Sequence, residues 1–373
     1  MPNQILQLIL IGLLTMEMIS CGNSADMEET TKSTNEDRES ETTLDENDEI
    51  TSTETNPVTT TEPKIEYVYP SINLGGESFT IINTTRDDMA YTAVDFETST
   101  GEKLDDAIYE RNRELENKFN FKLEVEEFLP DKANKQYRND VMVQGEKYDV
   151  GFLNSSFIVA MFNYSKDIDS VPGLQLDKPW WDKAATDRSR LGAKKHAMYA
   201  ASDMSLAGFE GTAVTFFNEN LFSELKLDSL YQLVSDGKWT FDKLNEYMKA
   251  AENLNYEYVS MAGNSETIYN SLISSAGIDY IGVQSDESYY FGGTTDRFAE
   301  VASKINTYFG RRSVFVGAAD DCEKGFANGK ILFVNGKLSS AAKLDALQSA
   351  YGIVPVPKWD ESQEEYSSLC LSS

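Results

Sequence analysis

Hydrophobic and polar positions alternate with two different periods in the part of the chain that follows residue 66. Residues 79–83 form a short apolar run, whereas apolar residues recur near the helical period over 103–119. Residues 121–128 alternate between apolar and charged side chains, which is typical of a half-buried strand. A polar helix at 131–144 and an apolar strand at 148–153 complete the pattern. This βαβαβ order predicts a parallel sheet that is covered by helices.

A second alternation of strands and helices follows, without an internal repeat. Short apolar runs separated by amphipathic stretches again indicate an α/β unit. The expected strands are Ala197–Ala201, Ala213–Phe217, Tyr258–Ala262, Val314–Val316, Ile331–Val334 and Ile353–Val356. The expected helices include Phe241–Asn253, Glu266–Ser275, Asp296–Phe309 and Leu338–Leu347. The pattern therefore predicts a second α/β unit after the first.

The first 21 residues have the pattern of an export signal. Ile5–Leu14 is apolar apart from Gln7 and Gly12, and it is shorter than the roughly 20 residues of a membrane span. Its length suits the hydrophobic region of a signal peptide. Small and apolar residues then lead into Cys21, which resembles a bacterial lipobox, although the first four residues include no Lys or Arg. We expect a lipoprotein signal peptide over 1–21 with lipidation of Cys21; the alternative is a secreted protein with a free Cys21.

The segment that follows Cys21 is strongly acidic and lacks aromatic residues. Residues 22–63 contain thirteen Asp or Glu, two basic residues and fifteen Ser or Thr. Such a composition buries too little apolar surface to offset the entropy of ordering the chain. We therefore interpret residues 22–65 as a disordered, self-repelling tether between a lipid anchor and the globular part.

Composition narrows the classes of function. The chain has 373 residues, which exceeds one typical core and favours two lobes. Its formal net charge of −29 repels phosphate backbones, so nucleic acid is not an expected partner. The single histidine, His196, excludes chemistry that needs two imidazoles, and the three cysteines show no CxxC spacing. We expect neither a metal nor another cofactor.

Six phrases of the sequence follow one another in a recognisable order. They are Tyr148–Val150, Lys178–Lys183, Phe216–Asn218, Gly237–Asp242, Gly325–Gly336 and Tyr351–Lys358. Taken together they cover roughly residues 76–366, and they resemble the extracellular solute-binding proteins of carbohydrate importers, the broad maltose-binding-type group.

The resemblance implies an α/β, two-lobe, periplasmic-binding-protein-like fold with a hinge. Residues 66–212 and 366–373 would form the first lobe, and residues 213–365 the second. The chain would cross between lobes near Thr212–Phe217 and return near Tyr366–Ser373. The group usually continues past this point, so we expect the C-terminal part of the first lobe to be missing from the sequence, which would leave apolar surface and a sheet edge uncovered.

The resemblance also implies a set of ligand contacts, since sugar recognition needs planar polar groups and aromatic faces. One of the two adjacent tryptophans would face the ligand and the other the core. Asn264 could instead cap the helix that starts at Ser265, and Arg86 could belong to a solvated turn. The aromatic residue that the group places after Asn335-Gly336 is replaced by Lys337-Leu338, which argues against a maltose-like ligand. The candidate contacts are Thr85, Arg86, Asn154, Ser155, Ser156, Trp180, Trp181, Glu210 and Asn264.

The resulting hypothesis is a non-enzymatic, monomeric binder of a sugar or oligosaccharide. It would be held on the extracytoplasmic face of the cell membrane by its lipid anchor and would deliver the solute to the permease subunits of an ABC-type importer. An oligopeptide or another polar solute is the alternative ligand. A secreted glycosidase would need two carboxylates about 5–10 Å apart, and no motif singles out such a pair. A surface adhesin is disfavoured because the pattern is βα rather than all-β.

Overall fold

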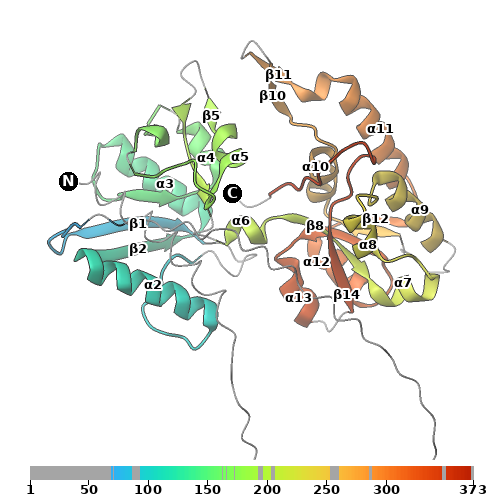
Figure 1. Cartoon of the computed structure of the whole chain (residues 1–373), viewed down its shortest axis with the longest axis horizontal. Helices are drawn as coiled ribbons and strands as arrows, with labels where there is room; N and C mark the ends of the chain where they lie inside the picture. Colours follow the sequence, from blue (N-terminus) through green and yellow to red (C-terminus); the bar gives the residue numbers. More distant parts are fainter. Residues whose placement is uncertain are drawn as a thin grey trace, which may run out of the picture.

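The computed structural model of the chain describes residues 69, 71–85, 93–161, 163–164, 166–171, 173–191, 196–202, 206–252, 260–284, 288–346 and 350–370. These residues form two α/β lobes, and the chain crosses from one to the other just before strand β8 (Figure 1). The predicted signal peptide and tether lie outside the described residues. No helix in the described ranges combines the length and the hydropathy that a membrane span requires.

The first lobe contains a parallel sheet with the strand order β2-β1-β3. Its strands are β1 (Ser78–Thr84), β2 (Lys122–Phe128) and β3 (Val150–Phe152), joined by helices α2 (Lys103–Phe119) and α3 (Pro130–Met142). The predicted βαβαβ unit is confirmed, and α2 has the predicted bounds. Ile108, Leu115 and Phe119 of α2 are buried because the helical period places them on one face. Leu115 and Phe119 pack with Phe79 and Ile81 of β1 in one core.

Short elements complete the first lobe. They are α4 (Ser155–Ala160), a 3₁₀ turn (Ile168–Ser170), β4 (Trp181–Asp182), α5 (Lys183–Arg188), β5 (Arg190–Leu191), β6 (His196–Ala197) and β7 (Ala201–Ser202). The predicted strand Ala197–Ala201 is wrong, because β6 pairs with β5 whereas β7 pairs with β4. Ala197 and Met198 are nevertheless buried. The apolar run at 197–201 therefore indicates buried side chains and does not indicate a continuous strand.

The second lobe contains a five-stranded sheet with the order β12-β9-β13-β8-β14. Strands β9, β13 and β12 are parallel, and β8 runs antiparallel to both of its neighbours, β13 and β14. All six residues of β8 are buried, as expected for a central strand. The predicted strands are confirmed in position, with small shifts at their ends; Tyr258 and Val259 of the predicted strand Tyr258–Ala262 lie outside the described residues. The strands are β8 (Ala213–Asn218), β9 (Met261–Gly263), β12 (Val314–Val316), β13 (Phe333–Lys337) and β14 (Tyr351–Pro355).

Helices cover both faces of this sheet, and the four predicted helices are confirmed. One face packs against α9, α10 and α11, and the other packs against α12 and α13. A two-stranded hairpin, β10 (Ile281–Val283) with β11 (Tyr289–Phe291), follows α10. The helices are α7 (Glu219–Leu225), α8 (Leu230–Ser235), α9 (Phe241–Ala251), α10 (Ser265–Ser275), α11 (Asp296–Phe309), α12 (Ala319–Ala327) and α13 (Ser340–Ala346), with a 3₁₀ turn at Gly292–Thr294.

The two lobes are joined where two distant parts of the chain run side by side. Helix α6 (Ala207–Glu210) precedes Thr212, which forms an antiparallel bridge with Cys370. The backbone N–H of Ala213 donates to the carbonyl of Leu369 over 2.8 Å. We call this paired segment, Thr212–Ala213 beside Leu369–Cys370, the crossing. The chain therefore reaches the crossing a second time near its predicted return, while the boundary residues of the lobes stay a prediction.

One buried hydroxyl in β8 has no hydrogen-bond partner within the described ranges: the Oγ1 of Thr215. Thr215→Val keeps the shape and removes the orphaned group, so we expect it to stabilise the chain by about 1 kcal/mol in urea unfolding. The matched control is Thr186→Val, because the buried Thr186 hydroxyl donates to the Asp182 carbonyl at 3.0 Å. That variant should lose about 1 kcal/mol. A loss of stability for Thr215→Val would instead indicate a buried water on this hydroxyl.

Candidate functional site

A polar pocket of about 240 Å³ lies where strands β9 and β13 end. Ligands of open α/β sheets bind beyond the carboxyl ends of the strands, since loops and helix starts gather there. The described groups that line it include two carboxylates, two ammonium groups, two amides and three hydroxyls. They belong to Glu266, Glu323, Lys337, Lys343, Asn264, Asn335, Thr267, Ser339 and Ser340. Such a mixture of planar acceptors and donors can bind a ligand that is rich in hydroxyl groups.

A second hollow, of about 370 Å³, lies at the other end of β8, against α7 and α8. Its lining includes Phe217, Phe222 and Tyr231, and it faces away from the crossing. The smaller pocket is the better candidate, because it combines strand ends, helix starts and convergent polar groups next to the segment that joins the lobes.

The centre of charge in the pocket is an ion-pair cluster between α12 and α13. Glu323 is 4% exposed, and its carboxylate lies 3.4 Å from the Nζ of Lys343. The same Nζ lies 2.9 Å from Asp320. The hydrogen bond to Asp320 raises the pKa of Lys343, so this lysine is cationic at neutral pH. The pocket wall thus places the buried Glu323 carboxylate, a hydrogen-bond acceptor, next to the Lys343 ammonium group, a hydrogen-bond donor. This pair suits two neighbouring hydroxyl groups of a ligand.

Asn264 lines the pocket and also caps a helix. Its side-chain oxygen accepts a hydrogen bond of 3.0 Å from the backbone N–H of Glu266, at the start of α10. The helix-cap alternative is therefore confirmed. Because the residue is also part of the pocket lining, it stays a candidate ligand contact.

Glu210 lies next to the pocket rim, at the end of α6. It is buried, and its backbone carbonyl accepts a 2.9 Å hydrogen bond from the N–H of Ser339, a lining residue. The neighbouring Phe209 is 65% exposed and was not among the sequence candidates. Phe209 lies in the short helix α6 beside the buried Glu210, so its exposure depends on how this single turn packs and could not be inferred from the sequence.

The first-lobe candidates follow the ends of neighbouring strands. The N–H of Thr85, directly after β1, donates to the Phe128 carbonyl at 2.9 Å. Asn154 follows β3, and its carbonyl accepts from the N–H groups of Phe157 and Ile158 at the start of α4. Thr85 and Asn154 therefore share one edge of the first sheet. Ser155 and Ser156 begin α4, but their side chains lie outside the described part of the chain, as does Arg86.

Trp180 and Trp181 are both buried, which differs from the expectation that one of them faces the ligand. Both are buried in the core of the first lobe, and the indole N–H of Trp181 donates to the Leu174 carbonyl at 2.7 Å. Adjacent side chains point apart on a regular strand. Here Trp181 opens the two-residue strand β4 while Trp180 belongs to the preceding turn, so both rings turn inward.

Glu323 and Lys343 were missed by sequence reasoning. A weak signal exists in α12, where Glu323 lies beside the apolar positions Cys322 and Phe326, which form the buried face of the helix. Their partnership with Lys343 depends on how α12 and α13 pack, which the spacing does not predict. Among the described residues, no group of three or more His, Cys, Asp or Glu side chains could hold a metal ion.

Neither Cys322, which is buried, nor Cys370, which is exposed, forms a disulfide. Burial raises the pKa of Cys322 to about 11. Because the thiolate is the reactive form, we expect iodoacetamide at pH 8 to modify Cys370 readily and Cys322 slowly. The rate at Cys322 should rise about tenfold per pH unit as the pH approaches the pKa. Mass spectrometry of timed digests measures both rates, and equal rates at pH 8 would contradict the burial of Cys322.

Comparisons with known proteins show similarity in structure only. No protein-family model matches the sequence, and no curated protein matches it in sequence. The GacH receptor of Streptomyces glaucescens, solved unliganded and with acarbose and an acarbose homolog, has a TM-score of 0.50 at 12% identity. The match covers 79% of this chain and 69% of that one.

A second solved structure is a cyclo/maltodextrin-binding protein in complex with maltotetraose. Its TM-score is 0.51 at 14% identity, and the match covers 76% of this chain and 66% of that one. The chain thus spans about two thirds of the length of these two proteins. The strand order, the crossing and these similarities together show that the chain has the two-lobed α/β fold of periplasmic-type solute-binding proteins.

Proposed function

We propose that this chain captures a small hydroxylated solute, a sugar or short oligosaccharide, between its lobes and passes it to an ABC-type permease. The observation that carries the proposal is the polar pocket at the ends of β9 and β13, beside the crossing of a two-lobed fold. The two similar structures were solved with acarbose and with maltotetraose, which supports the choice of solute class.

The pocket groups suit the recognition of hydroxyls. The Glu323 carboxylate accepts two hydrogen bonds from neighbouring hydroxyls, while Lys343 and backbone N–H groups at the start of α12 donate to their oxygens. The pocket contains as many carboxylates as ammonium groups, so it favours a neutral solute over a strongly charged one. Its volume lies below the roughly 300–1,000 Å³ of pockets for drug-sized ligands, so the second lobe holds one ring of a longer ligand.

Contacts from both lobes are complete only when the lobes approach each other. A solute that binds both walls therefore shifts the population toward the closed arrangement. Thr85, Asn154 and the start of α4 are the described first-lobe groups that we assign to the opposite wall. Binding without turnover follows from this role, because the solute must leave unchanged for transport.

A thermal-shift screen followed by calorimetry tests the solute class. We expect neutral mono- or oligosaccharides to raise the melting temperature and to be recovered intact after prolonged incubation. If oligopeptides and no sugar raised the melting temperature, the solute would be a peptide, and the proposed role in solute capture would stand. Cleavage of the sugar during the incubation would refute the assignment as a binder.

The proposal includes a lipid anchor at Cys21, supported by the apolar run that ends there and by the acidic segment that follows. Metabolic labelling with a fatty-acid probe should tag the wild-type chain. Cys21→Ala should lose the tag and appear in the medium, whereas Cys370→Ala should behave as the wild type. Equal labelling of the Cys21→Ala variant and the wild type would exclude this anchor.

A further inference from the structure

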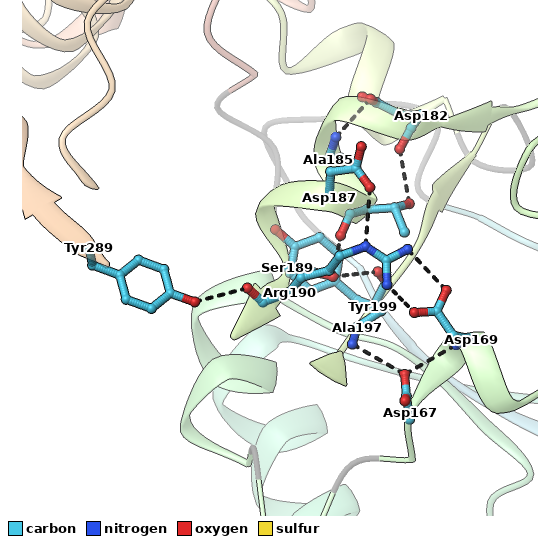
Figure 2. A network of polar contacts seen from close by, with 11 residues as sticks. Asp167, Asp169, Asp182, Ala185, Asp187, Ser189, Arg190, Ala197, Tyr199 and Tyr289 are labelled. Atoms are coloured by element: carbon cyan, nitrogen blue, oxygen red, sulfur yellow. Dashed lines mark hydrogen bonds and ion pairs between the residues drawn. The ribbon is translucent and has the colours of Figure 1, made fainter. Parts of the chain in front are cut away.

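Polar groups around Arg190 in the first lobe are paired with one another (Figure 2). The Arg190 guanidinium lies 3.0 Å from the Asp169 carboxylate. The buried hydroxyl of Ser189 lies 2.7 Å from the Thr186 carbonyl and 3.0 Å from the Tyr199 carbonyl. Such pairing is the rule, because a buried donor or acceptor without a partner has lost its hydrogen bonds to water and gained none. An unpaired buried group beside a pocket therefore needs an explanation.

Asn335, a lining residue of the polar pocket, departs from this rule. It is 1% exposed, and its amide nitrogen has no hydrogen-bond partner within the described ranges. Its amide oxygen does have one, because the Oγ of Ser271 on α10 lies 2.9 Å from it. An amide nitrogen carries two N–H donors and no acceptor. Asn335 therefore offers a buried donor for which the described part of the chain supplies no acceptor.

The register of the sheet explains why this amide lies beside the pocket. Side chains alternate across a strand, so Asn335 and Lys337 of β13 share one face, and both line the pocket. Thr267, four residues before Ser271 on the same face of α10, lines it too. The Asn335 side chain thus lies between β13 and the first turns of α10. Its χ2 torsion is soft, so the amide can tilt toward the pocket while Ser271 keeps its oxygen.

The Thr215 hydroxyl provides a comparison within the same sheet. Thr215 lies opposite Asn335 in the β8–β13 ladder, is fully buried, and also has no partner among the described residues. The hydroxyl and the amide nitrogen therefore do not satisfy each other. Thr215 does not belong to the pocket lining, whereas Asn335 does. Of these two groups, only the Asn335 donor can be completed by a molecule that enters the pocket.

We propose that Asn335 determines specificity in the pocket by donating a hydrogen bond to an oxygen of the bound solute. Ser271 holds the amide oxygen and so keeps the nitrogen available for this bond. A solute without an oxygen at this point leaves the donor unpaired and is rejected. Together with the Glu323 acceptor, the pocket then selects a neutral solute that offers both a hydroxyl donor and an oxygen acceptor. This inference rests on the proposed function, since it names how the same pocket chooses its solute.

Urea unfolding of the Asn335→Leu variant, in the full chain without solute, tests whether the donor is unpaired. Leucine keeps the approximate shape, and the Ser271 hydroxyl still reaches the Ile268 carbonyl at 3.1 Å. We expect an unchanged or higher midpoint, because no buried group loses its last partner. The matched control is Asn218→Leu, which should lower the midpoint. The buried Asn218 side chain accepts a 3.1 Å hydrogen bond from the Leu221 N–H and caps α7.

Calorimetry with D-glucose, D-galactose, D-xylose and maltotetraose tests the contact itself. Each of these sugars that binds the wild type should bind the Asn335→Leu variant about 5- to 100-fold more weakly. Asn335→Asp keeps the oxygen that Ser271 holds and exchanges only the donor, so it should lose affinity as well. Thr215→Val should bind as the wild type does, because it removes the neighbouring unpaired group outside the pocket lining.

A lower midpoint for Asn335→Leu would overturn the proposal, because the amide would already have a partner in the free chain. Wild-type affinity in both Asn335 variants would also overturn it. An equal loss of affinity in Thr215→Val would do the same, by assigning the effect to the sheet. If trialanine and no sugar bound the wild type, the proposed solute class would fail. The Asn335 contact would then be decided with trialanine, whose carbonyl oxygens can accept the same bond, so the two ideas can fail separately.

Discussion

Trp239→Ala is expected to destabilise the chain by about 3–5 kcal/mol, the range for truncating a large buried aromatic side chain. Trp239 is fully buried, and its indole N–H donates to the Pro355 carbonyl over 2.8 Å. Its ring centroid lies 5.7 Å from that of Phe333, in the centre of the larger core. Alanine would leave a cavity and an unpaired carbonyl. Urea unfolding followed by far-UV circular dichroism measures the change.

Trp359→Ala is the matched control for this experiment. Trp359 is only partly buried, and its ring lies under the cationic groups of Arg297 and Lys304 at 4.3 and 4.4 Å. Its loss removes surface packing and cation–π contacts, so we expect a smaller change of about 1–2 kcal/mol. If the two variants lost equal stability, Trp239 would not hold the central position that the structure gives it.

Glu323→Gln is expected to weaken solute binding about 10- to 100-fold, the range for hydrogen bonds that involve a charged group. The carboxylate is the buried acceptor of the pocket, and glutamine keeps the shape but replaces one acceptor oxygen with a donor. Calorimetry with a solute identified in the screen provides the measurement. The control is Glu219→Gln in the other hollow, which should leave affinity unchanged. If the Glu323→Gln variant bound the solute as tightly as the wild type, the solute-binding site would lie outside this pocket.

Local hydrophobic spacing predicted the elements well. Helices α2 and α11 and strand β12 have their predicted bounds, because the helices have apolar residues at the helical period and the strand is a short apolar run. The strand at 197–201 failed for a physical reason. Small and apolar residues there are buried by packing against the rest of the lobe, while the backbone pairs with two separate partners. Burial and strand pairing give the same sequence signal over five residues.

The candidate site was only partly predictable. The resemblance to solute-binding proteins led to Thr85, Asn154 and Asn264, each of which does follow a strand. It could not identify Glu323 and Lys343, because their proximity depends on the packing of α12 against α13. The tryptophan pair misled the prediction, since a turn placed both rings in one core. Residue type therefore suggested which side chains can bind hydroxyl groups, whereas the packing of the helices determines which of them line the pocket.

Strand β8 also determines how the molecule would respond to a pulling force. It leaves the crossing and runs between β13 and β14, with backbone pairs along both edges. A force that draws the lobes apart along β8 would load both ladders in shear, so many hydrogen bonds would have to break together rather than one after another. The junction is therefore compliant to bending, where only the short crossing deforms, and stiff to extension. Such a force would therefore leave the second sheet intact until both ladders break together.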